Sequence, residues 1–66
     1  MVPNLIVRRD GGRLSILDSQ YKEVALVVAD WDSRRAIIVY AVDVSLEQVQ
    51  SIVGQCWPTL TCATQQ

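Results

Sequence analysis

The stretch VALVVADWDSRRAIIVYAV, residues 24–42, consists of two apolar runs separated by a short charged tip. Both runs are rich in β-branched residues, which favour strands, and the polar residues 32–34 between them suit a turn. We therefore expect two antiparallel strands, at about 24–31 and 35–43. Successive side chains of a strand point to opposite faces, so these two strands present apolar side chains on both faces of their sheet.

Two further strands are expected upstream of this stretch, at about 4–9 and 13–18. Residues 10–12, Asp-Gly-Gly, form a strong turn signal between them, because glycine adopts the positive φ that tight hairpins require. A polar connection at 19–23 leads into the third strand. The chain up to residue 43 thus predicts a four-stranded antiparallel meander.

The clearest local signal is the start of a helix at about 45–56. Ser45 and Gln48 have the spacing of a capping box, which satisfies the free N–H groups of the first turn. Pro58 disfavours helical geometry at the residue before it, so the helix should end by about residue 56. A single apolar stripe at helical spacing makes this helix amphipathic; its members are Leu46, Val49, Ile52, Val53 and Cys56.

The tail, residues 57–66, alternates apolar residues with threonines at 59–63 and is compatible with a short fifth strand at the edge of the sheet. The predicted fold class is α+β: a four-stranded antiparallel β-meander followed by one amphipathic C-terminal helix, in a single domain spanning residues 1–66.

The length and composition limit the classes of protein to consider. With 66 residues the domain is small and only marginally stable, and such chains usually depend on a disulfide, a metal or a second copy. Half of the residues are hydrophobic and the net charge is −1, which disfavours disorder. An isoelectric point near 5.0 disfavours nucleic-acid binding through bulk positive charge.

No segment has the length of a membrane span, and the N-terminus lacks the pattern of a secretory signal. We therefore expect a cytoplasmic protein that does not enter a membrane. In that compartment Cys56 and Cys62 are expected as reduced thiols, although a bridge between them remains the alternative.

Residues suited to catalysis or metal binding are scarce. The chain has no histidine, so the commonest general base is missing, and two cysteines fall short of a tetrahedral zinc site. Asp30 and Asp32 alternate onto one face, but a single D-x-D pair is weak support for an active site. We predict no catalytic residue, no metal and no cofactor, and hence a protein that is not an enzyme.

One helix covers only one face of the sheet, so the other face exposes an apolar patch that monomers rarely leave bare. A second copy is the simplest cover, which predicts a homodimer formed by sheet packing or by joined edges. The alternative is that the tail, residues 57–66, folds back over this face. The expected dimer interface consists of Ala25, Val27, Ala29, Ile38, Tyr40 and Val42.

In a meander the first and third turns lie at the same end of the sheet. All five arginines flank these two turns and outnumber the three nearby aspartates, which gives this end a charge of about +2. Arginine and tryptophan are enriched at binding hot spots. The alternative is that these arginines pair with Asp10, Asp30 and Asp32 across the hairpins. The expected partner-binding residues are Arg8, Arg9, Arg13, Trp31, Arg34, Arg35 and Trp57.

The leading hypothesis is a small non-enzymatic protein–protein interaction module, an adaptor or inhibitor, that forms a homodimer and docks on an unidentified protein partner through this arginine- and tryptophan-rich pole. A second hypothesis is a nucleic-acid-binding regulator that uses the same hairpin tips, which the low isoelectric point disfavours. A third is a structural subunit of an assembly, whose important surface is its apolar sheet face.

Overall fold

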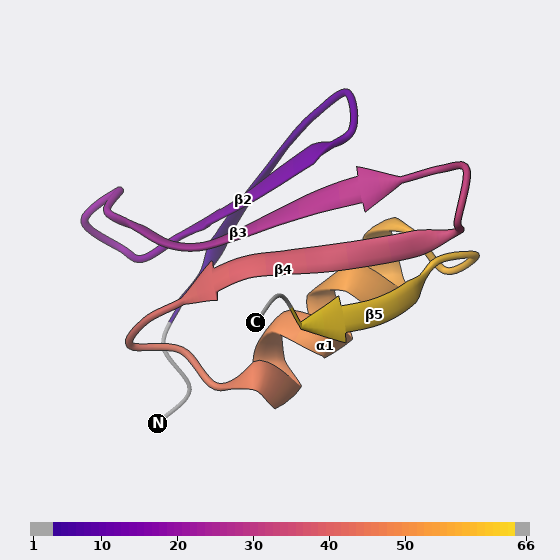
Figure 1. The fold of residues 1–66 in the computed structure, drawn as a ribbon. Coiled ribbons are helices and arrows are strands. Elements are labelled where there is room, and N and C mark those ends of the chain that lie inside the picture. The colour runs from indigo at the N-terminus through magenta and orange to yellow at the C-terminus, as the bar shows by residue number, and fades with distance from the viewer. Residues whose placement is uncertain (1–3, 65–66) are drawn as a thin grey trace.

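The computed structural model describes residues 4–64 and contains one five-stranded sheet with a single helix against one face (Figure 1). The strands follow one another in chain order across the sheet, and the first four form an antiparallel meander. The predicted α+β class is therefore confirmed. The elements are β1 (Ile6–Asp10), β2 (Arg13–Leu17), β3 (Glu23–Asp30), β4 (Arg35–Ala41), α1 (Leu46–Cys56) and β5 (Thr61–Thr64).

Helix α1 begins with the predicted capping box. The backbone N–H of Gln48 donates to Oγ of Ser45 over 3.1 Å, and the backbone N–H of Ser45 donates to Oε1 of Gln48 over 3.0 Å. The helix ends at Cys56, two residues before Pro58, as the sequence predicts. Within residues 4–64, no helix has the length and hydropathy needed to cross a bilayer.

Strand β5 confirms a fifth strand in the tail, and it pairs in parallel with β4. The chain reaches it through α1, which lies against one face of the sheet and connects the two parallel strands (Figure 1). Before β5, Trp57 and Leu60 enter the core on the helix side. Over its described residues the tail thus widens the sheet, and the alternative in which it covers the second face is wrong.

The core lies between α1 and the sheet. Leu14 and Ile16 of β2 are fully buried there, and they pair with Val27 and Ala25 of β3, respectively. Because alternate residues share a face, these pairs identify the helix side of each strand. The buried apolar cluster consists of Leu14, Ile16, Val24, Ala25, Val27, Ala36, Ile38, Val49, Val53, Trp57 and Leu60.

A β-bulge between β3 and β4 changes which side chains share a face. Val27 pairs with Ile38, and the preceding residue of β3, Leu26, pairs with Tyr40, so Val39 is an extra residue in β4. Ile38 therefore lies on the helix side and Tyr40 on the opposite side. Simple alternation along β4 would place these two residues on one face, and that part of the prediction is wrong.

Most of the predicted dimer interface lies under the helix. Ala25 and Val27 are fully buried, Ile38 is nearly so, and Ala29 packs against the same core. The prediction of an exposed contact surface is wrong for these four residues, because α1 covers the face that they share. Of the six residues predicted, only Tyr40 within β4 and Val42 just after it are exposed.

Candidate interaction surface

The sheet face opposite α1, called the open face below, has no covering element among the described residues (Figure 1). Strand register arranges its side chains in cross-strand rows. The first row contains Asp10, Arg13, Val28, Ile37 and Ala63. The second row contains Arg8, Ser15, Leu26 and Tyr40.

The centre of the open face, where its two rows cross β3 and β4, is apolar. Val28 and Tyr40 remain 38% and 37% exposed, while Leu26 and Ile37 between them are half-buried. Val39, the extra residue of the bulge, is 38% exposed. Neighbouring apolar side chains on one face form the kind of patch that marks a contact surface in soluble proteins.

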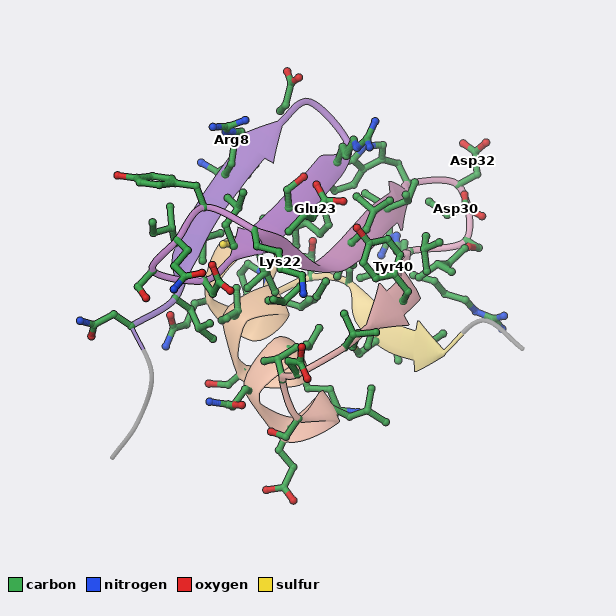
Figure 2. All side chains as sticks on the ribbon, turned by 90° about the vertical axis from the view of Figure 1, so that its left-hand side faces the viewer. Arg8, Lys22, Glu23, Asp30, Asp32 and Tyr40 are labelled. Carbon is green, nitrogen blue, oxygen red and sulfur yellow. The ribbon has the colours of Figure 1, made fainter. Side chains whose placement is uncertain are left out.

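Beside this apolar centre, a polar cluster surrounds the carboxylate of Glu23 in β3. The Tyr40 hydroxyl donates a hydrogen bond to the carboxylate of Glu23 (Figure 2), and this bond lowers the pKa of Glu23 and raises the pKa of Tyr40. A hydrogen bond from Ser15 and the charges of Arg13 and Arg8 also lower the pKa of Glu23. Glu23 is therefore an ionised carboxylate at neutral pH, flanked by two cations.

Most arginine charges have no close acidic partner. Within residues 4–64 the one salt bridge of 4.0 Å or less joins Lys22 to Asp43, and both side chains are exposed. The expected alternative, in which the arginines pair with aspartates across the hairpins, is therefore not found. Asp30 instead accepts the N–H of Ser33 over 3.4 Å, and the hydrogen bonds from Ser33 lower the pKa of Asp30.

The first and third turns lie side by side, as predicted. The N–H of Ala29 donates to the carbonyl of Gly12 over 2.7 Å, which joins the two hairpins next to their turns. Trp31 then meets Trp57 edge to face, with ring centroids 5.8 Å apart. Trp57 is 6% exposed and Trp31 is 54% exposed. Half of the Trp31 indole thus covers the core, and the rest faces solvent.

Arg9 has a structural role on the helix side of β1. Its Nη1 donates to the backbone carbonyl of Cys56 over 3.3 Å, at the C-terminus of α1. The last turn of this helix contains no basic residue. Arg9 therefore supplies, from a neighbouring strand, the cation that the negative end of a helix dipole favours.

The seven predicted partner-binding residues do not form one surface. Register places Arg8, Arg13 and Arg35 on the open face. Arg9, Trp31 and Trp57 lie on the helix side. Arg34 lies in the β3–β4 turn with a φ of +57°, and its carbonyl accepts the N–H of Thr61 over 2.9 Å.

The open face brings together residues that the sequence did not single out. Leu26, Val28 and Ile37 form its apolar centre, and Glu23 forms its acidic site. The pairing of Val27 with Leu14 is the signal that would have identified this face, because the apolar Leu14 and Ile16 of β2 alternate with the polar Ser15. That pairing depends on the register of the hairpin, which composition alone does not determine.

The described residues contain no cluster of three or more side chains suited to hold a metal ion. Cys56 and Cys62 are both free thiols, and burial raises the pKa of Cys62, which disfavours a reactive thiolate. No family model matches the chain, and no curated protein or solved structure matches it either.

Proposed function

We propose that the chain is a small non-enzymatic interaction module, an adaptor or inhibitor, that forms a homodimer and docks on a protein partner. The docking tip consists of Trp31, Arg34 and Arg35, at the junction of β3 and β4. The observation that carries the proposal is the half-exposed indole of Trp31 at a turn whose arginines have no salt bridge within the described residues.

The chemistry of the docking tip fits an acidic protein surface. A guanidinium group binds a carboxylate through two parallel hydrogen bonds, and those of Arg34 and Arg35 are not engaged by a salt bridge within residues 4–64. Trp31 is already held by its contact with Trp57, so its ordering costs little on binding. A pre-ordered, half-exposed indole in the same turn as two arginines supports a hot spot for protein recognition.

Charge balance favours a protein over nucleic acid as the partner. On the open face Arg8, Arg13 and Arg35 are matched by the acidic residues Asp10, Glu23 and Asp30. Protein surfaces that bind nucleic acid instead carry clustered basic residues over a broad area. The whole chain has a net charge of −1, so long-range attraction to a phosphate backbone is weak.

The test is affinity capture from nuclease-treated cell extract, with the tagged chain as bait and mass spectrometry as the readout. The double variant Arg34→Glu/Arg35→Glu should lose the captured protein, because it repels an acidic surface. The matched control is Lys22→Glu, which reverses an exposed charge just before β3, at the end of that strand opposite the tip. Capture unchanged by the double variant overturns the proposal, and capture that nuclease abolishes supports nucleic acid instead.

A further inference from the structure

We infer that a second copy of the chain binds the open face, with a two-fold axis that runs across the strands between the two rows of side chains. This inference rests on the homodimer in the proposed function and identifies its surface and symmetry. The face has no other occupant within residues 4–64, because α1 packs on the opposite side and β5 extends the sheet edge.

The apolar side chains of the two rows complement one another under this symmetry. An axis between the rows lays each strand over the same strand of the second copy and exchanges the two rows. Each residue of the first row then faces the residue of the second row that lies on the same strand. Val28 then faces Leu26, and Ile37 faces Tyr40. Every such contact occurs twice, since a two-fold interface uses the same surface on both copies.

The charged side chains select the direction of the axis. Arg8 and Asp10 lie two residues apart on β1, both on the open face, and form no salt bridge with each other. An axis across the strands brings Arg8 of one copy against Asp10 of the other, twice per dimer. The same axis sets Arg13 against Ser15, whose hydroxyl can accept its N–H, whereas an axis along β3 would place Arg13 against the apolar Ile37.

The remaining acidic groups on β3 lie outside the two rows and have cations nearby. Arg35 lies opposite Asp30 and lowers its pKa, and Arg13 acts in the same way on Glu23. The axis between the two rows also sets Asp30 of one copy against Glu23 of the other, and the nearby charges of Arg35 and Arg13 offset this repulsion. The interface thus combines an apolar centre with two symmetric charge pairs at its rim, as protein interfaces generally do.

The first experiment compares two valine variants by sedimentation equilibrium at micromolar concentrations. Val28→Asp places a carboxylate at the centre of the interface and should raise the dissociation constant at least about 100-fold, since each dimer would bury that charge twice. Val7→Asp is the matched control: Val7 is 40% exposed on the other face of the sheet, and its variant should dimerise normally. Circular dichroism verifies that both variants fold.

The second experiment exchanges the rim charges. Arg8→Asp and Asp10→Arg should each weaken the homodimer about tenfold, because each variant sets like charges against each other. The double variant Arg8→Asp/Asp10→Arg should restore wild-type affinity, and a mixture of the two single variants should form heterodimers. Arg8 and Asp10 are both exposed in β1, so these substitutions report on association rather than on folding.

The outcomes separate this inference from the proposed function. The open-face dimer is overturned if the Val28→Asp variant dimerises as well as the wild type, or if the double variant Arg8→Asp/Asp10→Arg does not restore wild-type affinity. Either result leaves the proposed docking tip unaffected. A wild-type chain that stays monomeric overturns both this inference and the homodimer. Capture through Arg34 and Arg35 then decides separately whether a monomeric module docks on a partner.

Discussion

The two faces of the sheet carry similar apolar residues in different surroundings. Ile37 and Ile38 are neighbours in β4, yet Ile38 is 2% exposed under α1 while Ile37 lies half-buried on the open face. The helix side derives its stability from cover within the chain. The open face has the residue types of a core without that cover, and apolar surface left in this state favours association.

The adjacent arginines Arg8 and Arg9 show the same contrast for charged side chains. Arg9 points to the helix side and binds the carbonyl of Cys56, so its charge serves the fold. Arg8 points to the open face and has no salt bridge within residues 4–64, so its charge is available to another molecule. One residue of difference along a strand separates a guanidinium that binds the fold from one without a salt bridge within residues 4–64.

The largest expected effect comes from the two isoleucines. Ile38→Ala should lower the free energy of unfolding by about 2–5 kcal/mol, because it leaves a cavity in the core. Ile37→Ala should cost much less in dilute protein, since its side chain borders solvent. Urea denaturation followed by circular dichroism measures both, and equal losses would contradict the distinction between a covered and an uncovered face.

Local signals explain why much of the fold is predictable from the sequence. The β-branched runs, the Asp-Gly-Gly turn and the capping box each depend on residues close in the chain, and the structure contains all three. Gly11 has the positive φ, +62°, that the first turn requires. The adjacency of the two hairpin turns, and hence of Trp31 to this end of the sheet, follows from meander topology alone.

The composition of the two faces was not predictable, because it depends on register. The bulge at Val39 shifts Tyr40 to the face opposite Ile38, and no residue pattern in β4 predicts this bulge. The parallel pairing of β5 depends on the path of α1 across the sheet, which is a tertiary feature. Arg9 was grouped with the partner-binding residues because its contact, Cys56, lies 47 residues away in the chain.

The capping box at the first turn of α1 stabilises the helix that covers one face of the sheet. Removing it should lower the free energy of unfolding by less than the change in the core. Ser45→Ala removes the hydroxyl that accepts the N–H of Gln48 and should cost about 1 kcal/mol of unfolding free energy. Ser51→Ala is the control, because Ser51 is exposed inside α1 and alanine is the better helix former. Thermal unfolding that ranks Ser51→Ala as the more damaging change would contradict the capping role.

A still smaller effect is expected at the C-terminus of α1. Arg9→Gln removes the positive charge next to the last carbonyls of the helix and should cost about 0.3–1 kcal/mol. Arg8→Gln, the adjacent change on the open face, should leave the stability of dilute protein unaltered. Urea midpoints at low and high salt test the pair, and the loss in Arg9→Gln should shrink at high salt because the interaction is electrostatic.

The smallest effect concerns pH and the pair of Glu23 and Tyr40 on the open face. The pKa of Glu23 is lowered from its ordinary value of 4.5, so its bond with Tyr40 stabilises the fold above pH 4.5 and is lost as pH falls through the lowered pKa. The pKa of Tyr40 is raised above its ordinary 10.0, so the phenol's contribution is present below pH 10.0 and is lost as pH rises through the raised pKa. Tyr40→Phe should therefore flatten both edges of the profile of stability against pH, whereas Tyr21→Phe, a change at an exposed turn residue, should keep them. If the loss of stability at acid pH is the same in Tyr40→Phe as in the wild type, the hydrogen bond between Tyr40 and Glu23 does not stabilise the open face of the isolated chain.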